Sequence, residues 1–129
     1  MGDTPVMKIL PIDPEHIRGP RASEFPLSIR TLATPALLVD SARLEHNLAA
    51  MQRLAEQCGV RLRPHAKSHK SLTVGRRQLE HGAAGLCVAK IGEAAVFADA
   101  GFEDLLLAYP TVGWRAEAAA ELAERNPRL

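Results

Sequence analysis

Strand-like and helix-like segments alternate along most of this chain of 129 residues. The strand-like segments lie near residues 60–66, 84–89 and 104–109, and the helix-like segments lie near 71–81, 91–100 and 114–125. Gly82 and Gly101 each follow a helix-like segment and precede an apolar run, as glycine does in turns between a helix and a strand. This alternation predicts an α/β fold with a parallel sheet and helical crossovers. A barrel and an open doubly wound sheet satisfy the pattern equally well.

The two later strand-like segments are nearly continuous in apolar residues, which is typical of strands covered on both faces. A further apolar run, Ala36–Asp40, follows Pro35 and ends in an acid. We expect it to form a buried strand, with Asp40 or Ser41 capping the next helix. That helix is indicated by apolar residues on one face, and Gly59 lies just past its C-terminal end. The residues of this face are Leu44, Leu48, Met51, Leu54 and Ala55.

The first 30 or so residues are rich in proline, which interrupts helices and deprives sheets of N–H donors. These prolines are Pro5, Pro11, Pro14, Pro20 and Pro26. We therefore expect an N-terminal extension over residues 1–33 and an α/β domain over residues 34–129. The extension is interpreted as a loosely ordered terminus, and a lid or a subunit-wrapping arm is the alternative.

Composition and charge narrow the classes of function. A net charge of +1 gives no general attraction to nucleic acid or acidic membranes. The only concentrated positive charge, Arg61–Lys70, contains no aromatic residue on which a base would stack, so we expect no nucleic-acid partner. No run approaches the ~20 apolar residues of a membrane span. Two cysteines without metal-type spacing, Cys58 and Cys87, predict reduced thiols and a cytoplasmic location.

The segment from Arg63 to Lys70 carries the strongest chemical signal. It reads Arg-Pro-His-Ala-Lys-Ser-His-Lys and places Lys67 where a strand-like segment gives way to a loop. In parallel α/β barrels this end of a strand belongs to the face that carries active sites. A lysine there can form a Schiff base with the aldehyde of a cofactor. Residue type alone favours an exposed surface lysine, so this interpretation depends on the flanking motif.

Two histidines flank this lysine. His65 and His69 lie four residues apart, a spacing that binds zinc when both side chains share one face of a helix. Here they flank the end of a strand, where that argument about faces fails. Two other interpretations stay open for them. They act beside the lysine or a phosphate, or they are hydrogen-bonded histidines of a loop.

Four segments, in order, resemble the start of the D-threonine aldolase and D-serine dehydratase-like family of fold-type III pyridoxal-phosphate enzymes. They are TPALLVD at Thr34–Asp40, RPHAKSHK at Arg63–Lys70, VAKIGEAAVFADAG at Val88–Gly101 and LLLAYP at Leu105–Pro110. The resemblance implies a (β/α)8 TIM barrel of the alanine-racemase type, with about three βα units present here. Because such a barrel needs roughly 250 residues, we expect residues 34–129 to be its N-terminal portion, without the C-terminal β domain.

Carried over by position, the resemblance makes Lys67 the residue that forms the Schiff base with pyridoxal 5′-phosphate. The nearby cations Arg63 and Lys70 are expected to disfavour another ammonium at Lys67. His65 and Tyr109 are candidate contacts of the cofactor, and core packing is the alternative for Tyr109. The implied activity is that of a lyase acting on a D-amino acid. It either cleaves a D-β-hydroxy amino acid such as D-threonine to glycine and an aldehyde, or dehydrates D-serine to pyruvate and ammonia.

The resemblance also implies a divalent metal, Mn, Mg or Zn, held by residues near the C-terminus of the complete protein, so no metal ligand is assigned in this chain. It implies a homodimer for the complete protein, and we expect the isolated chain to be inactive. Two other interpretations stay open. One is a non-catalytic pyridoxal-phosphate-binding barrel protein, and the other is a decayed remnant that acts as an interaction module.

Two further positions carry weaker expectations. Gly92 and Glu93 open a helix-like segment directly after a strand, a place where backbone N–H groups can bind an anion. Without a glycine-rich run, we interpret Glu93 as an acid that stabilises the start of the helix. Trp114 is expected to pack as a residue of the following helix.

Overall fold

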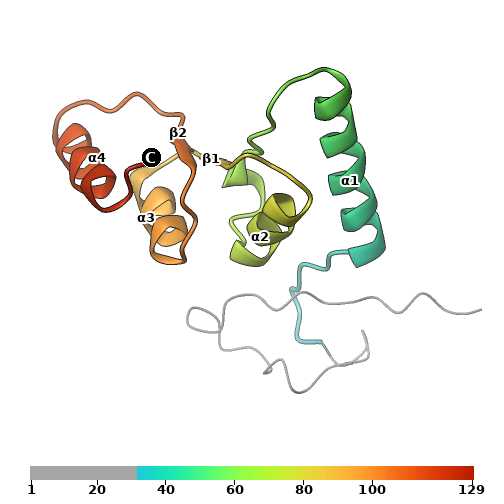
Figure 1. Cartoon of the computed structure of the whole chain (residues 1–129). Helices are drawn as coiled ribbons and strands as arrows, with labels where there is room; N and C mark the ends of the chain where they lie inside the picture. Colours follow the sequence, from blue (N-terminus) through green and yellow to red (C-terminus); the bar gives the residue numbers. More distant parts are fainter. Residues whose placement is uncertain (1–31) are drawn as a thin grey trace, which may run out of the picture.

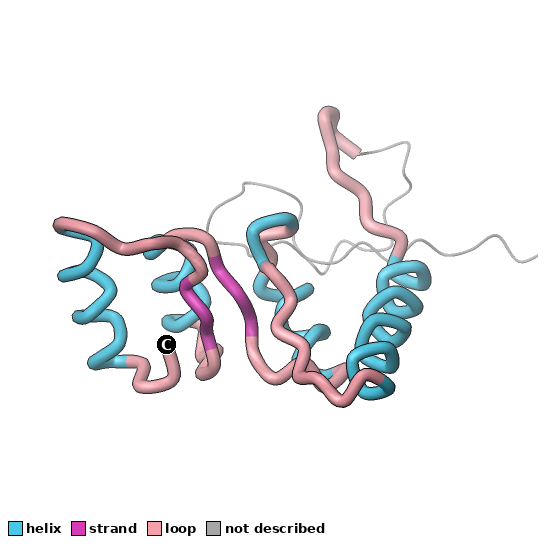
Figure 2. The backbone as a smooth tube through the Cα atoms, turned by 90° about the horizontal axis from the view of Figure 1, so that it is seen from above, coloured by secondary structure: helices cyan, strands magenta, loops and turns pink. Residues whose placement is uncertain are grey.

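Two short parallel strands form the centre of the molecule, β1 (Leu86–Val88) and β2 (Leu105–Leu107). The computed structural model describes residues 32–129, so the expectations for residues 1–31 lie outside the described part of the chain. Leu86 pairs with Leu105 and Val88 with Leu107. Figure 1 and Figure 2 show the two strands side by side, with the helices following one another in chain order in a row from α1 to α4. The parallel pairing confirms the predicted α/β class.

A third extended segment lies on the other side of β1, at residues 62–65. The Ala84 N–H donates to the Leu62 carbonyl at 2.9 Å, and the Cys87 N–H donates to the Pro64 carbonyl at 2.8 Å. His65 forms a parallel bridge with Cys87. This segment was expected to be a full strand over 60–66. It is reduced to a single bridge because Pro64 has no N–H to donate. Three strand-helix units are nevertheless present, as expected.

The helices begin and end close to where the sequence predicts. They are α1 (Ser41–Gln57), α2 (Leu72–Glu80), α3 (Ile91–Asp99) and α4 (Trp114–Arg125), and a short 3₁₀ turn, η3 (Ala66–Ser68), precedes α2. Asp40 caps α1 by accepting the Arg43 N–H at 3.0 Å, as predicted. Gly59 follows the helix with a φ of +65°, a conformation that favours glycine.

The core lies between the strands and the helices that follow them. Leu86 and Val88 of β1 are fully buried there, and Phe97 packs edge-to-face on Phe102, with ring centroids 5.0 Å apart. The buried cluster comprises Ala66, Leu86, Val88, Ala94, Phe97, Phe102, Leu105 and Leu122. Because side chains alternate along a strand, Cys87 and Leu106 point to the opposite face. Leu106 is 51% exposed, so the expectation that both strands are covered on both faces is wrong for β2.

The apolar run Ala36–Asp40 does not form the expected buried strand. Leu37 is 84% exposed, and no other segment within residues 32–129 pairs with this run. A strand needs a hydrogen-bonded neighbour to satisfy its backbone, and the described chain supplies none at this place. The described part of the chain also covers the predicted apolar face of α1 only partly, since Met51 and Leu54 are each 51% exposed.

Helix α1 is held to α2 by a small polar cluster. The Glu45 carboxylate pairs with Arg77 of α2, and its Oε2 lies 2.7 Å from Nε2 of His81, just past the end of α2. The hydrogen bond to His81 makes the largest contribution to holding the pKa of Glu45 below its ordinary value, and Arg77 adds to it. None of the helices within residues 32–129 combines the length and apolarity that crossing a bilayer requires.

Candidate functional site at the carboxyl edge of the strands

The carboxyl ends of parallel strands meet at one edge of a sheet, and here that edge carries the lysine singled out by the sequence. Lys67 lies in η3, directly after the extended segment 62–65, and its side chain is exposed. Tyr109 follows β2 and is 62% exposed, so its alternative interpretation as a core residue is wrong. The fold therefore brings Lys67 and Tyr109 to the same edge, from the two segments that flank β1.

His65 shapes the turn that contains Lys67. Its Nδ1 accepts the backbone N–H of Lys67 at 3.3 Å, and its carbonyl accepts the Ser68 hydroxyl at 3.3 Å. The ring thereby acts as the cap of η3. Nδ1 of His65 is thus engaged in a hydrogen bond with the backbone. The residue lies at the end of the extended segment, two positions before Lys67.

His69 has a similar role one turn later. Its Nδ1 accepts the backbone N–H of Ser71 at 3.1 Å, which places the proton of the neutral ring on Nε2. Nε2 is buried and makes no hydrogen bond within the described part of the chain. Burial lowers the pKa of His69, and the nearby Gln78 side chain and the bond from Ser71 offset this only in part. A neutral ring is therefore favoured.

These contacts match the interpretation of both histidines as hydrogen-bonded loop residues. The zinc alternative finds no support, because within residues 32–129 no group of three or more His, Cys, Asp or Glu side chains is arranged to hold a metal ion. The two cysteines, exposed Cys58 and buried Cys87, are both free thiols.

The two cations flanking Lys67 are each paired with a carboxylate. Arg63 makes two hydrogen bonds of 2.9 Å to Asp104, and Lys70 Nζ lies 3.2 Å from Glu93 Oε1. The charges of Arg63 and Lys70 are therefore each compensated by a neighbouring carboxylate.

Glu93 occupies the first turn of α3, as the sequence predicts for an acid that stabilises a helix start. Its Oε2 accepts the Ala89 N–H at 2.9 Å. Burial disfavours the ionised form, but this hydrogen bond and the Lys70 ammonium outweigh burial and hold the pKa of Glu93 below its ordinary value. The sequence predicted the place of Glu93 at the start of a helix, but it did not predict the ion pair with Lys70.

Cys87 is a neighbour of Lys67 that the sequence analysis did not connect with it. It lies in the middle of β1, is 7% exposed and pairs in register with His65. Burial raises the pKa of its thiol, and the positive charge of Lys67 counteracts this only in part. Lys67 is thus close enough for its charge to act on the thiol. Side chains alternate along β1, and Leu86 and Val88 face the core. This alternation in the sequence could have predicted that Cys87 points to the opposite face of the sheet.

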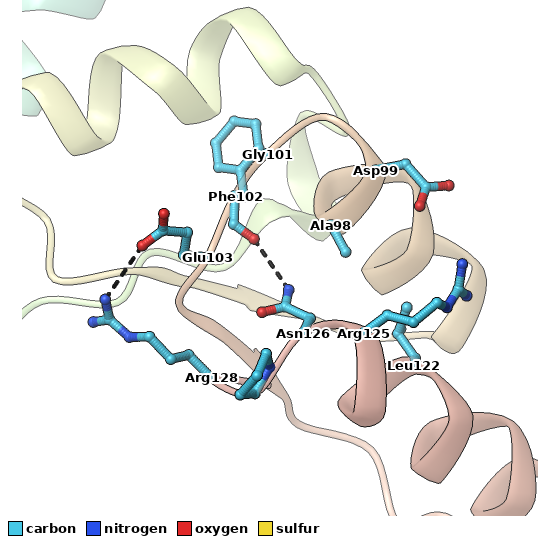
Figure 3. A pocket seen from close by; sticks show the side chains of 10 residues that line it. Ala98, Asp99, Gly101, Phe102, Glu103, Leu122, Arg125, Asn126 and Arg128 are labelled. Carbon is cyan, nitrogen blue, oxygen red and sulfur yellow. Dashed lines mark hydrogen bonds and ion pairs between the residues drawn. The ribbon is translucent and has the colours of Figure 1, made fainter.

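A cavity of about 380 Å³ lies at the other end of the strands, between the C-terminal ends of α3 and α4. Figure 3 shows Asn126 beneath it, donating to the Phe102 carbonyl at 3.2 Å, and Arg128 paired with Glu103. In a parallel α/β unit the C-terminal ends of the helices lie at the amino edge of the strands. The cavity is therefore remote from Lys67 and does not belong to the same site. Trp114, at the start of α4, is 66% exposed, so the expectation that it packs is wrong.

Strand-helix units that pair in parallel, with a lysine at the carboxyl edge, define the class as a parallel α/β domain. A model of the alanine racemase N-terminal domain family matches residues 39–128, and the chain belongs to this family.

Curated relatives also match much of the chain. A D-threonine aldolase of Arthrobacter sp is 46% identical over 80 residues, which cover 62% of this chain and 21% of that protein. A D-threo-3-hydroxyaspartate dehydratase of Delftia sp. strain HT23 is 40% identical over 99 residues, or 77% of this chain and 26% of the relative. A D-serine dehydratase of Dictyostelium discoideum is 31% identical over 106 residues, which cover 78% of this chain and 27% of that protein.

Solved structures agree with this assignment. The D-threonine aldolase of Filomicrobium marinum superimposes with a TM-score of 0.69 at 46% identity, over 72% of this chain and 26% of that one. The D-threo-3-hydroxyaspartate dehydratase of Delftia sp. HT23 gives a TM-score of 0.70 at 41% identity, over 74% of this chain and 25% of that one. The chain thus spans about a quarter of the length of these relatives. The resemblance read from the sequence motifs and the barrel-type fold it implied are confirmed.

Proposed function

We propose that this chain supplies the lysine-bearing part of a pyridoxal-phosphate-dependent lyase that acts on D-amino acids, with Lys67 as the residue that binds the cofactor. The observation that carries this proposal is the position of Lys67 at the carboxyl edge, in the first turn after an extended segment. The proposal is supported by relatives named as D-threonine aldolase, D-threo-3-hydroxyaspartate dehydratase and D-serine dehydratase.

The residues around Lys67 fit such a cofactor. The Lys67 amine forms no ion pair or hydrogen bond within residues 32–129, whereas Arg63 and Lys70 are both engaged with carboxylates. It is therefore the cation of this segment that is available to react with an aldehyde. The cap from His65 fixes the backbone of Lys67, and Tyr109 is an exposed aromatic group at the same edge. We assign cofactor contacts to Lys67, His65 and Tyr109.

Pyridoxal phosphate, when bound, supplies an electron sink for the bond that breaks at the α-carbon of an amino acid. The chain's own contribution at this edge is to fix the backbone of Lys67 through the His65 cap, with the buried thiol of Cys87 near enough to respond to the charge of Lys67. The relatives include both aldolases and dehydratases, so the substrate class proposed here is a D-amino acid with a β-hydroxyl group. A variant of a D-threo-3-hydroxyaspartate dehydratase was solved in a metal-free form, and we assign no metal ligand within residues 32–129.

A labelling experiment tests this assignment. The chain contains four lysines, Lys8, Lys67, Lys70 and Lys90, so each is resolved by peptide mass spectrometry after incubation with pyridoxal phosphate and reduction with borohydride. We expect the pyridoxyl group predominantly on Lys67. The Lys67→Ala variant should lose this label, while Lys90→Ala, which changes another exposed lysine, should keep it. Equal labelling of all four lysines would overturn the assignment.

A further inference from the structure

A single carboxylate joins two loops at the carboxyl edge of the strands. Glu93 Oε2 accepts the backbone N–H of Ala89, which follows β1, at 2.9 Å. Its other oxygen lies 3.2 Å from Nζ of Lys70, in the loop that contains Lys67. The Glu93 side chain is 13% exposed and that of Lys70 is 62% exposed, so the acid is the fixed partner and the lysine reaches over to it.

The loop that contains Lys67 turns sharply at Lys70. Its backbone N–H donates to the Ala66 carbonyl at 2.8 Å, which closes a turn around Lys67. The φ of Lys70 is +48°, a left-handed conformation that is unfavourable for a residue with a Cβ atom. A residue in such a conformation persists when the surrounding contacts hold it there. Two side-chain contacts hold it here, the bond from the Ser71 N–H to His69 Nδ1 on either side of Lys70 and the ion pair of Lys70 itself with Glu93.

We propose that Glu93 and Lys70 are positioning residues that hold the turn presenting Lys67. Glu93 ties this turn to the end of β1, and Lys70 transmits the restraint through its backbone bond to Ala66. The part of this inference that concerns pyridoxal phosphate rests on the proposed role of Lys67. Neither residue is assigned a contact with the cofactor, so both act through the position of the Lys67 turn.

The test uses the full chain and isosteric variants. Glu93→Gln keeps an oxygen that accepts the Ala89 N–H but removes the charge that pairs with Lys70. The matched control is Glu103→Gln, because Glu103 also pairs with a cation, Arg128 at 3.5 Å, but precedes β2 at the opposite edge. Lys70→Arg keeps the positive charge. Lys70→Met removes the charge but keeps a side chain of similar length. Far-UV circular dichroism verifies that each variant is folded.

Two readouts are compared. The first is the extent of pyridoxyl labelling at Lys67, which we expect to fall about two- to five-fold in Glu93→Gln and Lys70→Met, as for loss of a partly exposed ion pair. Lys70→Arg and Glu103→Gln should label like the wild type. The second is hydrogen exchange of the peptide covering residues 65–71, which should become faster in the first two variants, with α4 unchanged.

The outcomes separate the two proposals. Wild-type preference for Lys67 that persists unchanged in Glu93→Gln and Lys70→Met would overturn the positioning role and leave the proposed function standing. If pyridoxal phosphate labels Lys67 of the wild type no more than the other lysines, the proposed function is wrong. Faster hydrogen exchange of residues 65–71 in Glu93→Gln would in that case still support the restraint on the turn. Unchanged exchange in that case would overturn the restraint as well. Equal effects of Glu103→Gln would also count against it.

Discussion

The guanidinium of Arg63 and the carboxylate of Asp104 form two parallel hydrogen bonds, each 2.9 Å long, that span β1. Arg63 lies in the extended segment on one side of β1, and Asp104 lies just before β2 on the other side. Arg128 adds a third hydrogen bond to Asp104 at 3.1 Å, and its carbonyl accepts the Leu105 N–H at 3.2 Å. The chain after α4 thus returns beside β2, and one carboxylate connects three neighbouring segments.

The first prediction concerns the pH dependence of this cluster. Hydrogen bonds from Arg63 are the largest cause that holds the pKa of Asp104 below its ordinary value, and Arg128 adds to them. A carboxyl group with a depressed pKa stabilises the folded state above its unfolded pKa, and this contribution is lost as the pH falls below about 4. Asp104→Asn should therefore lower stability at pH 7, measured by urea unfolding. The difference from the wild type should shrink between about pH 5 and pH 3, and a difference that is constant with pH would contradict the assignment.

The second prediction concerns Gly85, which lies beside Asp104. A Cβ atom at Gly85 would come within 2.5 Å of the Asp104 carbonyl oxygen and 2.4 Å of its Oδ1. Because the nearest backbone atom cannot move without disturbing the pairing of β1 with β2, Gly85→Ala should cost about 1 to 3 kcal/mol of unfolding free energy. The control is Gly92→Ala in α3, where a Cβ atom meets nothing within 4 Å. That change should be neutral or stabilising by up to about 1 kcal/mol, since alanine favours helices.

The third prediction concerns the core. Phe102 is 2% exposed, packs edge-to-face against Phe97 and has the Arg76 guanidinium 4.9 Å from the centroid of its ring. Phe102→Ala should lower the free energy of unfolding by about 3 to 5 kcal/mol, because it leaves a cavity in the centre of the buried cluster. Trp114→Ala removes a larger but exposed ring and should change stability by less than about 0.5 kcal/mol. The stabilities of the two variants are compared by thermal unfolding monitored by circular dichroism. Equal losses of stability in the two variants would contradict the central place of Phe102 in the core.

The fourth prediction separates the two thiols. Cys58 is exposed, whereas Cys87 is buried and burial raises the pKa of its thiol. At pH 8, iodoacetamide should modify Cys58 rapidly and Cys87 much more slowly, because the thiolate is the reactive form and access is restricted. In urea the two should react at similar rates. A Cys58→Ser variant isolates the reaction of Cys87, and rapid modification of this variant under native conditions would show that β1 is open.

Local signals in the sequence predicted much of the secondary structure. The bounds of α2, α3 and α4 agree with the predicted helices within two residues, and the cap at Asp40 and the turn at Gly59 lie where expected. Gly82 and Gly101 adopt φ values of +105° and +82°, as their places after helices indicated. Helix caps and turn glycines depend on neighbours in the chain, so a pattern of a few residues is sufficient to predict them.

By itself, the sequence determined the order of strands and helices, the helix ends and the position of Lys67 at the end of an extended segment. The tertiary structure alone decided that Ala36–Asp40 pairs with no strand within residues 32–129, that one face of β2 is open there, and that Arg63 and Lys70 are paired with Asp104 and Glu93. The physical reason is separation along the chain. Arg63 and Asp104 lie 41 residues apart, and contacts of that kind depend on how strands align in space, which no local pattern of residues specifies.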